Sequence, residues 1–253
     1  MRWLEEMLDA EVRERAFVLA RGEREIPGLL WAPLDLRPGH PLVAICHGAS
    51  GSKREDYVLA LARRLARDGI CSVAIDGPVH GARRGRSPDD RALAFLEFSQ
   101  VWSGDAAMTD EMVADWRHTI DALQALPELG AAPLGWWGLS MGTILGLPVV
   151  AAEPRIGAAV LGLAGLTGPT RARLELDAPA VACPVLFVAQ WDDELFERAS
   201  VFALFEALGS VDKRLHAFPG RHGAVSSEAF ADSAAFLVRH LAPRAEGSER
   251  PRG

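Results

Sequence analysis

The sequence contains a serine whose neighbours suit it to attack a carbonyl carbon. Ser140 stands at the centre of a G-x-S-x-G pattern that runs from Gly138 to Gly142. A serine in this pattern sits on a sharp turn between a strand and a helix, and the small glycines let those two elements pass closely. Its hydroxyl is a weak nucleophile until a nearby base accepts the proton. Ser140 is therefore the candidate nucleophile, and the alternative is an incidental serine in a glycine-rich turn.

The candidate base must be a histidine that a loop can bring to Ser140. Of the 7 histidines, His222 lies in the stretch FPGRHG, after the last predicted strand and before the last predicted helix. A histidine in a glycine-flanked loop at that point can reach over the edge of a sheet. His80, in the loop after the strand predicted at 70–75, is the second candidate. The other histidines fall within or next to predicted helices and strands. At such positions a histidine more often has a packing or surface role.

An acid that orients the base is expected after the strand predicted at 185–189. The loop there reads QWDDE, with three adjacent carboxylates, Asp192, Asp193 and Glu194. The pattern alone leaves open which of them acts, and a solvated acidic turn without a catalytic role is the alternative.

The elements that must position these residues alternate between short apolar strands and amphipathic helices. Five- or six-residue apolar runs between helices indicate a mostly parallel sheet with helices on both faces, an α/β fold. Ligands of such sheets bind at the carboxyl ends of the strands, where the candidate residues fall. The predicted strands are 15–20, 26–31, 42–46, 70–75, 134–137, 156–163, 185–189 and 214–218. The predicted helices are 57–68, 92–102, 112–126, 141–152 with a kink at Pro148, 200–208 and 229–241.

From about 26 to 241 the chain resembles the α/β-hydrolase superfamily, and within it the single-domain serine esterases related to dienelactone hydrolases and prolyl oligopeptidases. The resemblance is carried by His47-Gly48, by the D-x-P-x-H-G-x-R stretch from Asp76 to Arg83, by the serine pattern and by the GRHG stretch. The order serine, acid, histidine is also that of this fold and differs from those of the two common serine-protease types.

The resemblance implies roles for further residues. The orienting acid would be Asp193, because related hydrolases place the acid third after a glycine, a position that Gln190 occupies here. Since Gln190 departs from the pattern, Asp192 stays as the alternative. Backbone N–H groups of Ala49 and Met141 would form the oxyanion hole. The alternative for the loop at Ala49 is a plain turn after a strand.

The implied activity is hydrolysis of esters with small or medium acyl chains through an acyl-enzyme, with no metal or cofactor. Dienelactone hydrolases themselves use a cysteine nucleophile, so Ser140 argues against that particular activity. A thioesterase, a small-substrate amidase or peptidase, and a ligand-binding protein without catalysis are the alternatives. The expected partner is a small ester, and the oligomeric state is left undetermined.

A long connection from about 83 to 111 predicts a small helical lid. Its helix at 92–102 carries Phe95, Phe98 and Trp102, which are candidates for the substrate pocket together with Trp191 beside the acidic loop. Packing on the domain core is an equally good interpretation of these aromatic residues. Two interpretations are open for Arg83, Arg84 and Arg86: they form a solvated basic turn, or they attract an anionic substrate.

Bulk properties limit the remaining possibilities. The chain has 253 residues, which fits one α/β domain over 1–242, and its last residues, 243–253, are polar and predicted to be disordered. A net charge of −7 argues against nucleic acid as a partner. The sequence has no secretory pattern at its start and no apolar run long enough for a membrane span. Its 3 cysteines lie in apolar runs, which favours free thiols and a cytoplasmic location.

Overall fold

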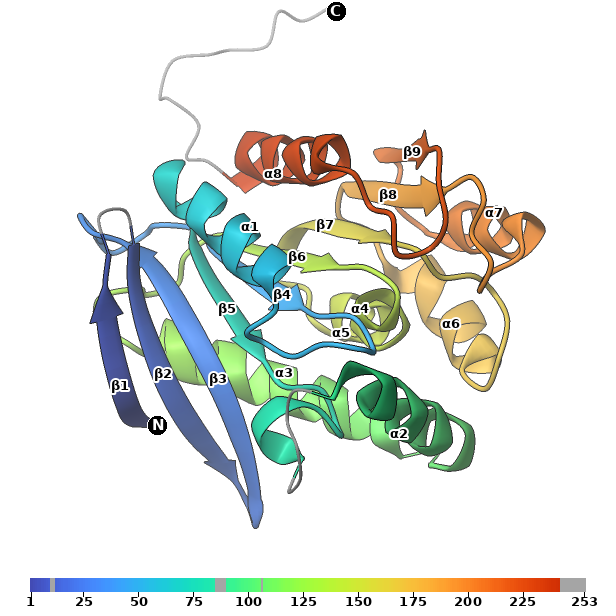
Figure 1. Ribbon diagram of the computed structural model, residues 1–253. Coiled ribbons are helices and arrows are strands. Elements are labelled where there is room, and N and C mark those ends of the chain that lie inside the picture. Colours follow the sequence, from blue (N-terminus) through green and yellow to red (C-terminus); the bar gives the residue numbers. More distant parts are fainter. Residues whose placement is uncertain (10–11, 85–89, 106, 242–253) are drawn as a thin grey trace, which may run out of the picture.

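The predicted apolar strands pair with one another in a single mixed sheet (Figure 1). The computed structural model describes residues 1–9, 12–84, 90–105 and 107–241. Within this part of the chain the sheet has nine strands, in the order β1-β2-β3-β5-β4-β6-β7-β8-β9. Their bounds are β1 Arg2–Leu8, β2 Val12–Arg21, β3 Arg24–Pro33, β4 Leu42–Cys46, β5 Cys71–Ile75, β6 Leu134–Gly138, β7 Ile156–Gly162, β8 Val185–Gln190 and β9 Lys213–Phe218.

The sheet is parallel where it carries the candidate site. Strands β4 to β9 run parallel to one another. Strands β1, β2 and β3 form antiparallel pairs, and β3 joins the rest through an antiparallel pairing with β5. Every residue of β4, β5, β6 and β8 is buried, as expected for strands covered on both faces. The predicted mostly parallel sheet is confirmed.

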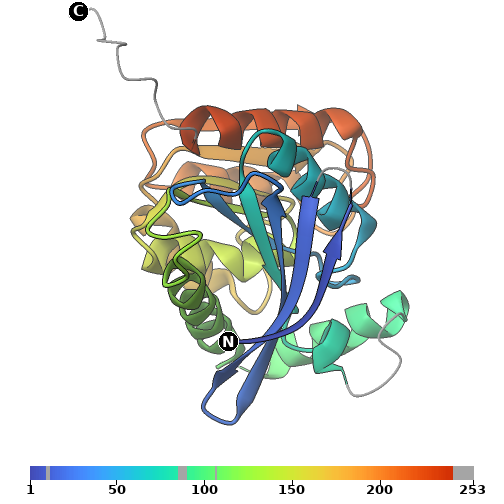
Figure 2. The same ribbon diagram turned by 90° about the vertical axis from the view of Figure 1, so that its left-hand side faces the viewer.

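Helices cover both faces of this sheet, and Figure 2, viewed from the β1 side, shows α8 and α3 on opposite faces. Neighbouring tryptophans of β6 illustrate the two layers: Trp136 packs with the core beneath α3, and Trp137 packs with the core beneath α1 and α8. The helices are α1 Asp56–Arg67, α2 Arg91–Gly104, α3 Met108–Gln124, α4 Met141–Ile144, α5 Gly146–Ala152, α6 Arg171–Asp177, α7 Arg198–Ala207 and α8 Ser227–Leu241, with short 3-10 helices at Gly81–Arg83 and Ala178–Ala180.

Three features differ from the sequence-based expectation. Strand β1 was not predicted, because most of its side chains are exposed at the sheet edge and carry no apolar alternation. Helix α6 lies in a connection that the sequence analysis left without an element. The helix predicted over 141–152 is divided at Leu145 rather than kinked at Pro148, since Pro148 has no N–H for the carbonyl of Ile144.

The predicted tail at 243–253 lies outside the described residues. In the part of the chain that the structure does describe, none of the helices combines the length and the apolar character that crossing a membrane would require.

Candidate active site

Ser140 lies in the tight turn between the end of β6 and the start of α4. Its backbone has φ 58° and ψ −119°, a conformation that non-glycine residues rarely adopt and that stores strain in the turn. Both glycines of the pattern are sterically required. A Cβ on Gly138 would collide with the backbone of Gly142, and a Cβ on Gly142 would collide with the carbonyl oxygen of Cys46. The G-x-S-x-G pattern therefore follows from the close crossing of α4 over β4 and β6.

Hydrogen bonds to β7 hold this strained turn. The N–H of Ser140 donates to the carbonyl of Gly162 at 3.0 Å. The Oγ1 of Thr143 accepts the N–H of Gly162 at 2.7 Å, and its hydroxyl lies within reach of the carbonyl oxygens of Gly138 (2.8 Å) and Gly162 (2.7 Å). Because Thr143 is fully buried, losing these bonds would leave unpaired polar groups in the core.

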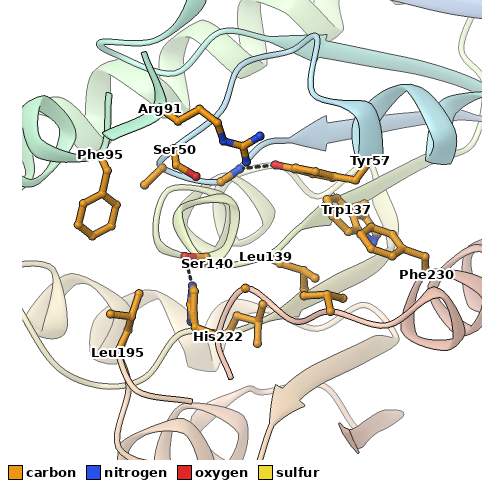
Figure 3. A pocket seen from close by; sticks show the side chains of 15 residues that line it. Ser50, Tyr57, Arg91, Phe95, Trp137, Leu139, Ser140, Leu195, His222 and Phe230 are labelled. Atoms are coloured by element: carbon orange, nitrogen blue, oxygen red, sulfur yellow. Dashed lines mark hydrogen bonds between the residues drawn. The ribbon is translucent and has the colours of Figure 1, made fainter. Parts of the chain in front are cut away.

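The structure brings Ser140, His222 and Asp193 into one hydrogen-bonded series. Nε2 of His222 lies 2.9 Å from Oγ of Ser140, as the dashed line in Figure 3 marks. Nδ1 of the same ring lies 2.8 Å from Oδ2 of Asp193. With the Nδ1–H donated to the carboxylate, Nε2 is free to accept the serine proton. This arrangement can deprotonate the hydroxyl during attack on a carbonyl carbon.

Asp193 is held as a carboxylate beside this ring. Its side chain is 3% exposed, and its second oxygen accepts the N–H groups of Leu195 (2.8 Å) and Phe196 (3.1 Å). Burial acts to raise the pKa of Asp193, but the hydrogen bond from His222 and the two N–H groups outweigh it, so the pKa lies below its ordinary value. The acid therefore stays ionised and fixes the tautomer of His222.

The neighbouring carboxylates point elsewhere. Asp192 is exposed and bonds through its N–H to the carbonyl of Gly220 (3.0 Å). Glu194 accepts the backbone N–H of His222 at 2.9 Å, which lowers the pKa of Glu194, and it pairs with Arg221 at 3.4 Å. Glu194 thus supports the loop that carries the histidine, a contact that the sequence analysis did not anticipate.

The two residues expected to supply the oxyanion donors border one hollow together with Ser140. Ala49 follows β4 and borders the same hollow as Ser140, and Met141 is the first residue of α4. Neither backbone N–H donates to an acceptor among the described residues. The N–H of Gly48 is bound to the hydroxyl of Tyr57 at 2.7 Å, which anchors the loop to α1. Two donors near the start of a helix suit a developing negative charge.

Two buried histidines fix this loop from behind. Nε2 of His47 accepts the N–H of Gly77 (2.9 Å), so its Nδ1–H faces the carbonyl of Gly48 (2.8 Å). Nε2 of His80 lies 2.8 Å from the carbonyl oxygen of Ala49. Burial lowers the pKa of His47 and lowers that of His80 to about 3, so both rings are neutral near pH 7. The structure therefore places His222, and not His80, at the serine.

The D-x-P-x-H-G-x-R stretch has a buried ion pair at its start. Asp76 is fully buried and pairs with the ammonium group of Lys53. The carboxylate also accepts the N–H groups of Lys53 (3.1 Å) and Ala82 (2.8 Å). These contacts tie the loop after β5 to the loop after β4, which places His80 beneath Ala49.

Two hollows meet at Ser140, and both are also bordered by Ala49, Phe95 and Leu195. The first, here called the histidine-side pocket, has a volume of about 320 Å³, and the second, the helix-side pocket, about 260 Å³. The histidine-side pocket is further bordered by Tyr57, Trp137, Leu163, His222, Val225 and Phe230. The helix-side pocket is further bordered by Phe98, Ser99, Trp102, Met141, Ile144 and Gly168.

The predicted substrate-binding aromatics divide between these pockets and the surface. Phe95 borders both pockets, whereas Phe98 and Trp102 border the helix-side pocket and also pack on the core. Trp191 borders neither pocket, so its predicted place at the mouth needs correction. The residue is 48% exposed, and Cζ of Arg198 lies 3.8 Å from the centroid of the Trp191 ring. Tyr57, Trp137 and Phe230 were missed, because they come from α1, β6 and α8 and no single pattern joins them.

The basic stretch after β5 differs from both sequence-based interpretations. Arg83 pairs with Asp115 at 2.7 Å, and Arg84 pairs with Glu97 at 2.8 Å, with both arginine side chains buried. They therefore tie the stretch to α3 and α2 instead of facing solvent or a substrate. Arg86 lies outside the described residues. Within the part that is described, His, Cys, Asp and Glu side chains do not gather in threes as metal ligands would.

Comparisons with known proteins agree with this geometry. The sequence profile of the dienelactone hydrolase family matches residues 26–235. A PEG-bound cold-adapted esterase from an Arctic intertidal metagenomic library is 39% identical, with a TM-score of 0.85 over 95% of this chain and 100% of that chain. A search of curated protein sequences gives no significant match.

More distant structures share the fold. A dienelactone hydrolase from Anabaena variabilis is 19% identical, with a TM-score of 0.64 over 91% of this chain and 99% of that chain. Est1E from Butyrivibrio proteoclasticus is 15% identical, with a TM-score of 0.65 over 90% of this chain and 99% of that chain. The expected α/β-hydrolase fold is thereby confirmed.

Proposed function

The chain belongs to the dienelactone hydrolase family, and from this premise we propose that it is a serine carboxylesterase acting on small or medium acyl esters. The observation that carries the proposal is the series of short contacts from Ser140 through His222 to Asp193. The similarity of the chain to a cold-adapted esterase supports ester hydrolysis. The serine at position 140 favours general ester hydrolysis over the cysteine-dependent activity expected of dienelactone hydrolases.

In the proposed first half-reaction, Oγ of Ser140 bonds to the carbonyl carbon while its proton passes to Nε2 of His222. The carbonyl oxygen takes up the negative charge and accepts the N–H groups of Ala49 and Met141. Each such donor is worth about 3–4 kcal/mol of barrier. His222 then gives its proton to the departing alcohol oxygen, which leaves Ser140 acylated.

In the second half-reaction, water attacks the acyl carbon and His222 accepts its proton. The same ring then protonates Oγ of Ser140, which releases the carboxylic acid and restores the enzyme. Asp193 stays ionised throughout and keeps the ring oriented.

The proposal is tested with p-nitrophenyl esters of graded acyl length on the wild type and on Ser140→Ala. We expect the variant to lose on the order of 10⁴-fold or more in kcat. Equal turnover by both proteins would reject the mechanism. A fluorophosphonate probe should label the wild type at Ser140 alone, and an unlabelled wild type would point to a ligand-binding protein. Thioester and amide substrates in the same panel establish the bond that is cleaved.

A further inference from the structure

The two pockets that meet at Ser140 differ in which catalytic group they contain. His222 borders the histidine-side pocket and not the helix-side pocket, whereas Met141 borders only the helix-side pocket. In Figure 3, Phe95 lies on one side of Ser140 and His222, and Tyr57 and Phe230 lie on the other. An ester bound at Ser140 therefore has two directions in which its two halves can extend.

The proton path decides which half extends in which direction. The oxygen that leaves must come within hydrogen-bond reach of Nε2 of His222, because that nitrogen protonates it. The carbonyl oxygen must meanwhile face the N–H groups of Ala49 and Met141. With these two oxygens fixed, the remaining substituent of the tetrahedral carbon, the acyl chain, points away from His222.

We propose that the helix-side pocket binds the acyl chain and that the histidine-side pocket binds the leaving alcohol. This assignment rests on the proposed ester hydrolysis at Ser140. It goes beyond that function because it states which walls of the site select which half of the substrate.

The walls of the helix-side pocket suit a short apolar acyl group. Nε1 of Trp102 donates to the hydroxyl of Thr170 at 3.1 Å, and its ring stacks on Phe98 with centroids 5.9 Å apart. A Cβ on Gly168 would lie 2.8 Å from the Trp102 ring, so the loop after β7 and α2 are already in contact there. The pocket volume of about 260 Å³ is below the range of pockets for drug-sized ligands.

The histidine-side pocket suits a larger alcohol that is aromatic or apolar on the side opposite Phe95. Its border also includes the polar residues Ser50 and Arg91, and Arg91 pairs with Glu55 at 2.8 Å. Tyr57, Trp137 and Phe230 contact one another with ring centroids 5.7–6.0 Å apart. Tyr57, Val225 and Phe230 also border a further hollow of about 580 Å³ between α1 and α8. The alcohol side therefore has a second hollow behind its aromatic wall, and the helix-side pocket shares no lining residue with that hollow.

The first test narrows the helix-side pocket with Ser99→Phe. Its matched control is Ser103→Phe, one turn along α2, because both hydroxyls donate to the carbonyl four residues earlier at 2.8 Å and Ser103 borders neither pocket. With a fixed p-nitrophenyl alcohol, Ser99→Phe should lower the ratio of kcat/KM for hexanoate to that for acetate by tenfold or more. Ser103→Phe should leave this ratio at the wild-type value.

The second test narrows the histidine-side pocket with Val225→Phe. Val211→Phe, the same change at a fully exposed position remote from both pockets, is the control. With a fixed acetyl group, Val225→Phe should lower the ratio of kcat/KM for naphthyl to that for methyl ester by tenfold or more. Ser99→Phe should leave the naphthyl-to-methyl ratio unchanged, and Val225→Phe should leave the hexanoate-to-acetate ratio unchanged.

The crossed design separates the outcomes. If Ser99→Phe alters the alcohol ratio and Val225→Phe alters the acyl ratio, the assignment is reversed and the inference is overturned. If the wild type hydrolyses no ester, the proposed function fails instead. Should a narrowing variant not fold, wild-type crystals treated with a p-nitrophenyl hexylphosphonate give the answer. Oγ of Ser140 bonds to phosphorus, its proton passes to Nε2 of His222, and p-nitrophenolate leaves. The hexyl chain should then lie in the helix-side pocket, and a chain in the histidine-side pocket would overturn the assignment.

Discussion

The turn around Ser140 and the helix α2 border the same two pockets, yet their surroundings constrain them very differently. In the turn, neither flanking glycine has room for a methyl group, and Thr143 is fully buried among its hydrogen bonds. In α2 only Ala94 and Phe98 are buried, and apolar side chains such as Leu96, at 57% exposure, face outward. The proposed nucleophile thus lies on the rigid part, whereas Phe95, Phe98, Ser99 and Trp102, which border the pockets, lie on the less buried helix.

The largest effect on activity is expected from a change at Asp193, the carboxylate that orients His222. In Asp193→Asn, the amide would donate to Nδ1 of His222, and Nε2 would then carry the hydrogen and could not accept the proton of Ser140. We expect kcat to fall by about 10⁴-fold. Asp192→Asn is the matched control, because the neighbouring carboxylate does not contact the ring. Ester kinetics on both variants test the assignment, which would be wrong if Asp192→Asn were the more damaging change.

A glycine in each region offers a second test, measured as stability. Gly142→Ala places a methyl group against the carbonyl of Cys46, and we expect a loss of about 3 kcal/mol in the free energy of unfolding. Gly104→Ala, at the end of α2, meets no atom within 4 Å and should gain about 0.4–1 kcal/mol, because it restricts the unfolded chain. Urea unfolding of both variants gives the difference. Equal effects would mean that the turn is less constrained than its contacts indicate.

The loop at Ala49 is also tightly held, because the buried ring of His80 bonds to the carbonyl oxygen of Ala49. Burial lowers the pKa of His80 to about 3 from an ordinary value near 6.5, so the unfolded chain binds a proton there that the folded chain does not. Between these pH values, stability should therefore fall as pH falls, with this group contributing a slope approaching 1.4 kcal/mol per pH unit, about the value for one proton.

In His80→Gln this part of the slope should disappear, because glutamine does not titrate, while its amide N–H can still reach the carbonyl of Ala49. His80→Ala should lower kcat about tenfold or more through a loosened oxyanion loop, and His80→Gln should restore part of it. Urea unfolding from pH 4 to 7 and ester kinetics supply the two readouts. An unchanged slope in His80→Gln would contradict the buried neutral ring.

The same contrast explains what could be predicted from the sequence. The turn was predictable because its constraint is local: the positions that cannot hold a Cβ are glycines next to the serine. The parallel strands were predictable because burial on both faces makes them continuously apolar. The acid was predicted as Asp193 only through the family resemblance, with Asp192 as the alternative. The local pattern could not choose, since the choice depends on how the loop pairs with β9, where the N–H of Trp191 bonds to the carbonyl of Phe218.

Contacts between distant segments were beyond the sequence. The wall of Tyr57, Trp137 and Phe230 joins three elements, and no spacing within one of them reveals it. Trp191 was misplaced for a related reason: its direction is set by the loop pairing and by Arg198, and not by its neighbours in sequence. Strand β1 was missed because an exposed edge strand needs little apolar alternation.

The smallest effect is expected from a substitution on the exposed face of α2. Leu96 is exposed on α2 and borders neither pocket, so Leu96→Gln removes no buried contact and keeps a good helix former. We expect the free energy of unfolding to stay within about 0.5 kcal/mol of the wild type and kcat/KM for acetate to stay unchanged. Phe98→Leu, one of the two buried positions of α2, is the contrast and should lower stability measurably through the lost stacking on Trp102. If Leu96→Gln were as damaging as Phe98→Leu, the outer face of α2 would carry a contact of its own, and the separation between a rigid turn and a tolerant helix would fail.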